Sequence, residues 1–343
     1  MDGAAPDAQA RAYRFAFTGR TGDYFRIWIV SLCLSLLTLG IYSAWGKVRK
    51  RRYLQAHTRL DGDGIDYRAS PLAVLRGRVL AVVFLGGFAL GAHFAPLLQL
   101  AFLLLIGALS PWIVVAAARF NARNSTYRNV PFAFDGRYGE AATVIIGGAL
   151  AVIASLGLAY PWYRMRRARF VVAHHRFGAT PFSTALDAGE FFLTYLFAFF
   201  MVVGLIALSA GVGFATAVVA GDGDALLLVL TVVIYAAYIA IYAFIRARTL
   251  NLIANSTMIG PVKLEGSLRA RKLAWLYVSN VVAVLATVGL ATPWATVRLA
   301  RYRAECLAAR TNAPLDTLLA GTSPDATATG AEVSDLFDVD VAL

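Results

Sequence analysis

The chain has 343 residues, of which 59% are hydrophobic and 15% are charged, and its formal net charge is +12. A soluble domain carries about 25% charged residues, so this composition excludes an ordinary water-soluble globule. The two cysteines, Cys33 and Cys306, are too few for a disulfide framework or a cysteine-based zinc site.

The N-terminal part of the chain is polar and basic. Residues 1–23 contain arginines and no long apolar stretch, so we expect no cleaved signal peptide and a flexible N-terminus over residues 1–14. A short alternating segment, Phe15–Gly19, comes next, and an apolar helix centred near residue 34 follows it. This helix is interrupted at Leu39-Gly40, where glycine favours a turn.

The same arrangement of residues recurs twice further along the chain. In each copy a glycine precedes a tryptophan by five positions, and arginines follow the tryptophan at four and seven positions. The residues that occupy the repeated positions are Trp45, Arg49, Arg52, Trp162, Arg166, Arg169, Trp294, Arg298 and Arg301. Self-similarity of this kind indicates an internal duplication, and we predict repeat units over residues 15–60, 132–178 and 262–305.

Two pairs of long apolar runs separate the three repeat units. They lie at about residues 79–94 with 97–118 and 191–216 with 225–245, and such lengths can cross a bilayer as helices. We assign membrane hairpins to residues 61–126, with flanking β elements around a turn at Asp61-Gly62, and to residues 179–257. Residues 311–343 contain acidic residues but no lysine or arginine, which predicts a disordered acidic tail.

The predicted fold is therefore an all-α polytopic membrane protein with small cytoplasmic β elements. Its seven apolar helical segments are centred near residues 34, 87, 107, 151, 203, 235 and 284. If all seven cross the membrane, the basic loops 164–189 and 246–272 fall outside the cell, against the positive-inside rule. If the three repeated segments re-enter instead, every basic loop and the C-terminal tail are cytoplasmic. The sequence leaves both topologies open.

The repeated tryptophans and arginines have two interpretations. Aromatic rings at the headgroup level and arginines that reach toward phosphates are the usual anchors of a membrane segment. The planar guanidinium also suits a specific phosphate or anionic-lipid site, so we take all nine residues as candidate anionic-lipid contacts. His57 and His174 occupy equivalent positions after two of the basic helices, where a helix-terminating role explains them better than metal binding.

Three stretches resemble the YjgN-like family of bacterial inner-membrane proteins, whose function is unknown. They are Leu37–Trp45 with Lys47-Val48-Arg49 after it, Thr58–Gly62, and Phe132–Gly139. The resemblance covers roughly residues 13–305 and implies a multi-pass location in the inner membrane. It carries over no catalytic, cofactor or metal residue.

The function we expect is non-enzymatic, because the sequence holds no acid/base, nucleophile or metal constellation. A basic cytoplasmic face would bind anionic lipid headgroups or a protein partner, with no cofactor and no nucleic acid. The alternative is a transporter or channel for a neutral or amphipathic solute, since internal duplication is common among transport proteins. A membrane-embedded enzyme is the third hypothesis.

Overall fold

The computed structural model describes residues 11–219 and 224–312. Over these residues one β-α-α-β unit occurs five times in succession. Each unit starts with a strand, continues through a hairpin of two helices and ends with a second strand. The three repeat units and two membrane hairpins expected from the sequence are therefore five copies of the same unit.

The units differ mainly in the length of their helices. The first contains β1 (Arg11–Phe17), α1 (Thr21–Leu37), α2 (Ser43–Ala56) and β2 (Thr58–Leu60). The second contains β3 (Asp63–Tyr67), α3 (Pro71–Phe94), α4 (Pro96–Arg123) and β4 (Ser125–Tyr127). The third contains β5 (Val130–Phe134), α5 (Tyr138–Ala154), α6 (Tyr160–Ala173) and β6 (His175–Phe177). The fourth contains β7 (Thr180–Thr184), α7 (Ala188–Val219), α8 (Asp224–Asn255) and β8 (Thr257–Ile259). The fifth contains β9 (Val262–Gly266), α9 (Ala270–Ala286), α10 (Thr292–Glu305) and β10 (Leu307–Thr311).

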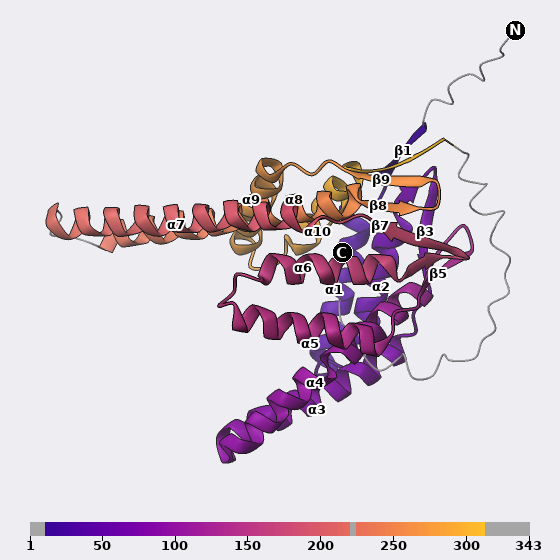
Figure 1. Ribbon diagram of the computed structural model, residues 1–343, viewed down its shortest axis with the longest axis horizontal. Helices are drawn as coiled ribbons and strands as arrows, with labels where there is room; N and C mark the ends of the chain where they lie inside the picture. Colours follow the sequence, from indigo (N-terminus) through magenta and orange to yellow (C-terminus); the bar gives the residue numbers. More distant parts are fainter. Residues whose placement is uncertain (1–10, 220–223, 313–343) are drawn as a thin grey trace, which may run out of the picture.

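The strands of the five units close into one antiparallel barrel, in the order β1-β10-β9-β8-β7-β6-β5-β4-β3-β2. Two-residue turns join consecutive units, and Asp61 and Gly62 in the first of them both have positive φ, as tight hairpins of this kind require. The barrel closes where β1 pairs with β10, with Arg11 opposite Thr311. All helices consequently leave the barrel from one end, and the turns between units lie at the other end (Figure 1).

The inside of the barrel is apolar and filled by side chains. Because side chains alternate across a strand, nearly every strand sends a large apolar residue inward, and these residues leave a cavity of about 110 Å³. The residues around it are Phe15, Leu60, Ile65, Tyr127, Phe132, Phe177, Ile259, Val262, Leu264 and Ala309. This shared core is what holds together strands of three to seven residues.

Three of the helical hairpins are short. In each, a helix of 17 residues is followed by one of 14 residues, and the turn between them has two consecutive residues of positive φ, such as Leu39 and Gly40. Gly40 N donates to the carbonyl of Ser35 at 2.7 Å, and Tyr42 N donates to Thr38 Oγ1 at 2.9 Å. The same bonds recur around Gly157 and Gly289. The interruption expected at these glycines is confirmed.

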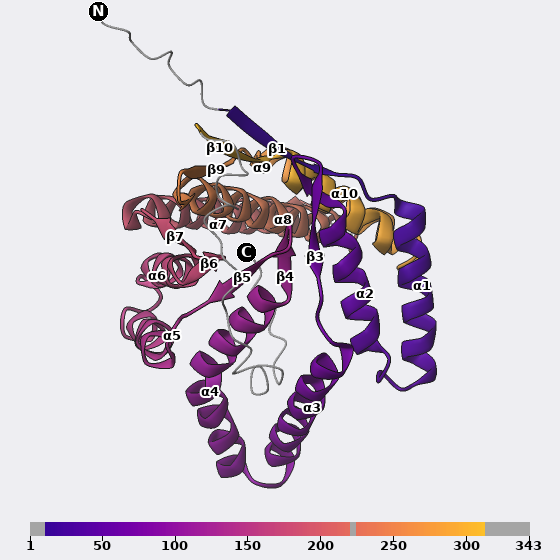
Figure 2. The ribbon, with the colours of Figure 1, turned by 90° about the vertical axis from the view of Figure 1, so that its right-hand side faces the viewer.

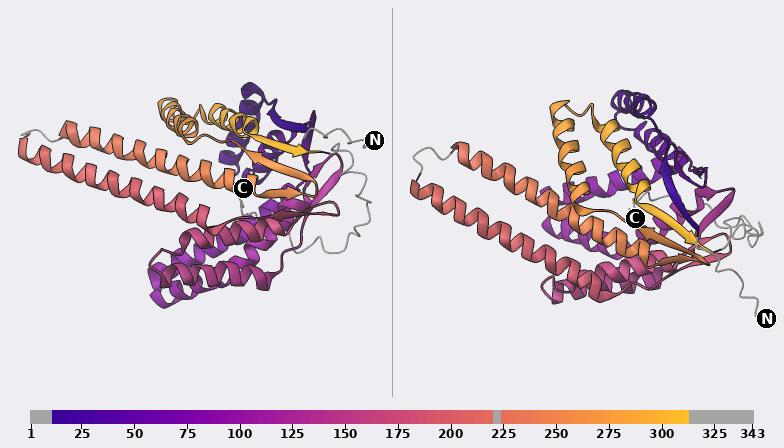
Figure 3. Two further views of the ribbon diagram at one scale, coloured as in Figure 1. Left: turned by 45° about the horizontal axis from the view of Figure 1, so that its top comes forward. Right: turned by 90° about the horizontal axis from the view of Figure 1, so that it is seen from above.

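The other two hairpins are long. Among the described residues, four helical segments are long and apolar enough to cross a membrane: Pro71–Gly91, Pro96–Arg123, Ala188–Phe214 and Leu230–Asn255. They belong to α3, α4, α7 and α8. The α7–α8 hairpin extends well beyond the short hairpins (Figure 1 and Figure 3), whereas the α3–α4 hairpin diverges from it (Figure 1). Figure 2 shows the helical hairpins arranged as a ring when the molecule is viewed from the barrel end.

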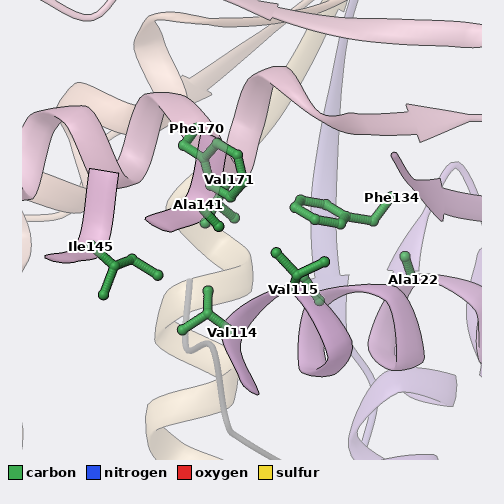
Figure 4. Close-up of a cluster of buried hydrophobic side chains, with 9 residues drawn as sticks. Val114, Val115, Ala122, Phe134, Ala141, Ile145, Phe170 and Val171 are labelled. Carbon is green, nitrogen blue, oxygen red and sulfur yellow. The ribbon is translucent and has the colours of Figure 1, made fainter. Parts of the chain in front are cut away.

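Neighbouring units pack through buried apolar residues at the base of the helices. Figure 4 shows one such cluster, in which Val115 of α4, Ala141 of α5 and Phe170 of α6 surround Phe134 at the end of β5. Val115 and Ala141 are completely buried, whereas the outer faces of the helices carry many exposed leucines, valines and phenylalanines. The hydrophobic core thus lies next to the barrel, and farther from the barrel the outer faces of the helices are apolar.

Several expectations need correction. The fold is not all-α, because the small β elements join into the closed barrel. The count of seven crossings is not confirmed, because the segments near residues 34, 151 and 284 form α1, α5 and α9, each of which turns back through the next helix to the barrel. Residues 11–14 belong to β1, although the flexible N-terminus was expected to extend to residue 14. Thr311 similarly ends β10, and most of the expected tail lies outside the described residues.

Candidate functional site

An equivalent side chain of every unit links it to the next unit. Four residues before the end of its second helix, each unit has a residue that donates a hydrogen bond to a carbonyl in or just after the first strand of the next unit. The bonds are Arg52 Nε to Tyr67 O (3.0 Å), Arg119 Nη2 to Gly136 O (2.8 Å), Arg169 Nη2 to Leu186 O (2.8 Å), Asn251 Nδ2 to Leu268 O (2.8 Å) and Arg301 Nη2 to Gly19 O (3.3 Å). We call these five residues the clasp. The clasp closes the ring, because Arg301 of the last unit reaches Gly19 of the first.

Three of the expected lipid contacts, Arg52, Arg169 and Arg301, therefore have partners inside the protein. Each uses one guanidinium nitrogen for the clasp while much of its side chain faces outward. An arginine has five N–H donors, so the clasp bond leaves donors that face away from the carbonyl. The primary contact that the structure gives these residues is nevertheless structural.

The remaining candidates form an outer belt, which we define as Trp45, Arg49, Trp162, Arg166, Trp294 and Arg298. Arg166 stacks over the ring of Trp162 at 4.8 Å, and Arg298 stacks over Trp294 at 4.9 Å. Arg49 lies instead over Tyr42 at 5.9 Å. The belt is on the outer side of the short hairpins, where Arg49, Trp162, Arg166 and Trp294 are exposed.

The belt tryptophans lie at one level along the molecule. Trp45, Trp162 and Trp294 each stand eleven residues before the end of their helix, which is about 16 Å from the barrel. Trp112 holds the same place in α4, and Phe244 holds it in α8. The residues beyond this level differ: the short hairpins turn within a few residues, whereas α4 and α8 continue as long apolar helices.

The sequence carried a signal for this equivalence that repeat analysis missed. Pro111-Trp112 copies the Pro161-Trp162 pair, and Arg119 follows Trp112 by seven positions as Arg169 follows Trp162. Because Pro111 lies inside a continuous helix, the pair was hidden in an apolar run.

Residues that end the second helices also occupy one structural position. His57 and His174 direct Nδ1 to the carbonyl four residues earlier, at 2.7 and 2.8 Å, and the amide of Asn124 donates to Phe120 O at 2.8 Å. The helix-terminating interpretation of the histidines is confirmed by these bonds. Ser256 holds this position in the fourth unit, directly after the end of α8.

A cavity with polar lining residues lies on the axis of the ring, between the second helices and the mouth of the barrel. Its volume is about 730 Å³, and its charged residues are Lys47, Lys50 and Arg51 of α2 and Arg303 of α10. Asn121 of α4 also lines it. No aspartate or glutamate is among its described lining residues. We call this space the cationic cavity; the sequence placed these basic residues in a cluster but did not show that they face inward.

A second, mostly apolar cavity of about 290 Å³ adjoins the cationic cavity. Both are lined by His175, Phe182 and Arg303, and the second extends between α6, α8 and α10 along residues such as Ile253 and Leu307. We call it the apolar lobe. The axis of the molecule therefore holds a cationic compartment with an apolar extension, enclosed by all five second helices.

The electrostatics of the cationic cavity favour an anion. Burial lowers the pKa of Lys50, and the positive charges of Arg78 and Lys47 lower it further. Arg51 Nη1 donates to Asn121 Oδ1 at 2.7 Å, and its guanidinium also lies 4.8 Å from the ring centre of Tyr67, so these two contacts help to position the cation. Like charges held this close are stabilised when an anion binds between them.

Two buried polar atoms of the cavity lining have no hydrogen-bond partner among the described residues, namely Gln55 Oε1 and Arg303 Nε. Buried polar groups are nearly always paired, so these atoms are suited to contact a bound molecule. His175 Nδ1 lies 2.6 Å from the carbonyl of Val171, and burial lowers the pKa of this histidine. Within the described ranges no three His, Cys, Asp or Glu residues are grouped for a metal ion.

Comparisons with known proteins agree with a bacterial membrane protein. A family described as "Bacterial protein of unknown function (DUF898)" matches residues 12–336. The inner membrane protein YjgN of Salmonella typhimurium (strain LT2) is 23% identical over 346 aligned residues, which cover 85% of this chain and 87% of the relative. The inner membrane protein YjgN of Escherichia coli K12 is 36% identical over 56 residues, or 16% of this chain and 14% of the relative. No solved structure matches the chain.

Proposed function

The chain belongs to the bacterial DUF898 family, and we propose that it is a non-enzymatic inner-membrane protein that binds anionic phospholipid headgroups through its outer belt. The family resemblance drawn from segments such as Leu37–Trp45 is confirmed. The relatives' location supports the inner membrane, and the four span-capable helices make the protein multi-pass.

The geometry supports an orientation with the barrel in the cytoplasm. A helix rises 1.5 Å per residue, so the 14-residue α2, α6 and α10 reach only about 21 Å, which is too short for a hydrocarbon core of about 30 Å. The longer α3, α4, α7 and α8 are sufficient. In this orientation the two long hairpins cross the bilayer, the three short ones enter the near leaflet, and all turns between units are cytoplasmic, as the positive-inside rule favours.

The tips of the short hairpins fit this placement. Leu39, Leu156 and Val288 are 96%, 95% and 93% exposed, respectively, and they lie just beyond the level of the belt tryptophans. Tryptophan prefers the membrane–water interface, so the apolar tips would enter the acyl region while the arginines stay at the phosphates.

The observation that carries the proposal is the stacking of Arg166 on Trp162 and of Arg298 on Trp294 at one level of the outer surface. A ring face supports the exposed guanidinium of Arg166, whose N–H fork can bind phosphate oxygens. Arg298 Nη1 also donates to Ser279 Oγ at 2.6 Å and to Asn280 Oδ1 at 3.2 Å, so only its other N–H groups are available to a headgroup. Two of the three short hairpins have this stacked pair, and in the first one Arg49 lies over Tyr42 instead. The protein would thereby recruit anionic lipid to its circumference.

Lipid counting in nanodiscs tests the proposal. The full chain is reconstituted in an equal mixture of phosphatidylglycerol and phosphatidylcholine, and retained phosphatidylglycerol is measured by mass spectrometry after extraction. The variant with Arg49, Arg166 and Arg298 changed to Gln should retain at least threefold less. A variant with the exposed barrel arginines Arg11, Arg14 and Arg59 changed to Gln loses the same charge and should match the wild type. Equal retention by both variants would refute the proposal.

The alternative function, transport of a neutral or amphipathic solute, has one observation in its favour, the axial cavity of about 730 Å³. Its cationic lining favours an anionic amphiphile over a neutral solute. Flux of such a solute in proteoliposomes that is unchanged by the three belt substitutions would favour this alternative.

A further inference from the structure

The closure of the barrel creates a strongly basic surface on four neighbouring strands. β2, β1, β10 and β9 lie next to one another in the barrel, and together they carry five basic residues and one acidic residue. The other six strands carry one arginine, one histidine and two acidic residues. The positive charge of the barrel is therefore concentrated around the seam where β1 pairs with β10.

The exposed basic residues of these four strands point away from the barrel interior. We call them the seam patch: Arg14, Arg59, Lys263 and Arg310. A chain neighbour of each lines the apolar cavity inside the barrel. Because side chains alternate across a strand, the patch itself faces outward.

Strand pairing gives these residues no acidic partner across β1. Each arginine of the patch is paired with an alanine: Arg14 with Ala308, Arg59 with Ala16, and Arg310 with Ala12. Arg310 is also directly opposite Lys263, and like charges in such positions repel each other. Arg310 has an ion pair with Glu265 at 3.0 Å, whereas the other three residues have none within the part of the chain that the structure describes.

Arginines elsewhere on the barrel do have acidic neighbours. Arg128, at the turn between β4 and β5, pairs with Asp61 and Asp63, and Arg176 Nη1 lies 3.7 Å from Asp135 Oδ2. The acidic side chains near the other strands are thus already in contact with basic ones. The seam patch is the part of the barrel surface whose charge is least balanced among the described residues.

An acidic segment of the same chain starts beside the seam patch. Residues 313–343 contain six acidic residues and no lysine or arginine, and β10 ends at Thr311, directly after Arg310. Four of the acidic residues are close together: Glu332, Asp335, Asp338 and Asp340. About 20 residues separate them from Thr311, and a chain of this length can span up to about 70 Å. A tethered segment meets its surface at an effective concentration on the order of millimolar, so several ion pairs that are weak alone can hold it.

We propose that the acidic segment, residues 313–343, binds to the seam patch, with the carboxylates of residues 332–340 in contact with Arg14, Arg59 and Lys263. The bound segment covers the most basic part of the barrel and shields it from other polyanions, such as nucleic acids, which bind basic surfaces without sequence specificity. The contact requires neither the outer belt nor the cationic cavity.

Zero-length coupling in the full chain tests the proposal. In a non-ionic detergent at low salt, a carbodiimide joins a carboxylate to a lysine amine only where the two groups are in contact. The chain has four lysines, Lys47 and Lys50 in α2, Lys263 in β9 and Lys272 in α9. Mass spectrometry of the digested monomer should find the acidic segment joined to Lys263. Joining mainly to Lys47 or Lys50 would place the segment in the cationic cavity, and this result, joining mainly to Lys272, or no joined peptide would overturn the proposal.

Two matched variants locate the contact. Changing Arg14 and Arg59 to Gln keeps Lys263 and should reduce its coupling to the acidic segment at least threefold. Changing Arg49 and Arg166 of the outer belt to Gln removes the same charge from exposed residues and should leave the coupling unchanged. The patch variant should melt within about 1 °C of the wild type, because substitutions of exposed side chains change stability little. Equal coupling in the two variants would refute the role of the patch.

Competition by a polyanion separates the acidic segment from other occupants of the patch. A short fluorescent oligothymidylate is titrated at low salt into the wild type and into a variant whose residues 332–340 have every Asp changed to Asn and Glu332 to Gln. The variant should bind the probe at least tenfold more tightly, because its patch is uncovered. Adding Arg14→Gln and Arg59→Gln should abolish this gain, whereas adding Arg49→Gln and Arg166→Gln should keep it. If the wild type binds the probe as tightly as the variant does, the patch is open in the folded protein and the proposal is wrong.

Discussion

The clasp gives a prediction that distinguishes two arginines of the same helix. Arg166 and Arg169 lie one turn apart on α6 and are both exposed, but only Arg169 donates a hydrogen bond across the unit boundary, to the carbonyl of Leu186 at 2.8 Å. Replacing Arg169 with Met removes that bond and leaves the carbonyl without its partner. Replacing Arg166 with Met removes the same charge but only a stacking contact with Trp162.

The expected difference follows from the two contacts. A hydrogen bond from a charged donor contributes about 1.5–3 kcal/mol, and because Arg169 is exposed we take the lower value of about 1.5 kcal/mol. The exposed stacking contact of Arg166 contributes about 0.5 kcal/mol. With an unfolding entropy of about 2.1 cal/mol/K per residue, the Arg169→Met variant should melt about 2 °C below the wild type, and Arg166→Met less than 1 °C below it.

The assay is thermal unfolding in detergent, followed by intrinsic fluorescence, with the lipid-retention measurement on the same samples. Arg166→Met should lower phosphatidylglycerol retention more than Arg169→Met does. If the two variants melt at the same temperature, or if Arg166→Met is the less stable one, the structural role assigned to the clasp is incorrect.

Three further predictions concern packing, charge and depth. Gly148→Ala should destabilise the protein by about 1–3 kcal/mol, because its Cβ would overlap the ring of Tyr163, whereas Gly147→Ala, which meets open space, should melt like the wild type. The pKa of Lys50 is lowered in the folded protein, so the positive charge of this residue opposes folding at pH values below that pKa. The melting temperature should therefore rise between neutral pH and about pH 10, and Lys50→Met should make this rise smaller. If the variant shows the same dependence of melting temperature on pH as the wild type, Lys50 is not a buried cation. In a chain with both native cysteines replaced by Ser, a fluorophore is attached to Leu156→Cys. Lipids that carry a nitroxide near the headgroup should quench it more strongly than lipids that carry the nitroxide near the bilayer centre. Labelling of this cysteine from the periplasm would refute insertion of the short hairpins into the near leaflet.

The local turns of the fold could be predicted from the sequence, but the barrel could not. Leu39-Gly40 and Asp61-Gly62 carry their own turn signals, and both turns form as expected. The barrel requires pairing of strands as short as three residues, such as Thr58–Leu60, which have no stability alone. Its closure also joins Arg11 to Thr311, at opposite ends of the chain, and no local pattern indicates such a contact.

The number of units was hidden by substitutions at the repeated positions. In the second unit Ala116 replaces the first arginine after Trp112, and in the fourth Phe244 replaces the tryptophan and Asn251 the clasp arginine. The clasp bond is kept, because an amide donates to a carbonyl as well as a guanidinium does. The clasp hydrogen bond therefore recurs in every unit, although the residue type that donates it differs.

The outer belt was predictable because its residues recur, whereas three of the four basic residues that line the cationic cavity come from one helix, α2. Lys47, Lys50 and Arg51 were part of a basic run, and their inward direction depends on how α2 packs between α1 and α3. Periodicity separates them from Arg49 and Arg52 but does not say which set faces the axis. Only the closed ring of five units makes that distinction.

The central structural claim is that five similar units form a single barrel and that all their helices lie at one end of it. Single cysteines at the exposed turn positions Asp61, Asn129, Ala179 and Pro261, and one at Gly223, can be labelled with a membrane-impermeant maleimide in a chain without its native cysteines. The four turn positions should react only in inside-out vesicles, and Gly223 only in spheroplasts. If Asn129 and Ala179 react from opposite sides, the chain crosses the membrane between them and the fivefold arrangement is wrong.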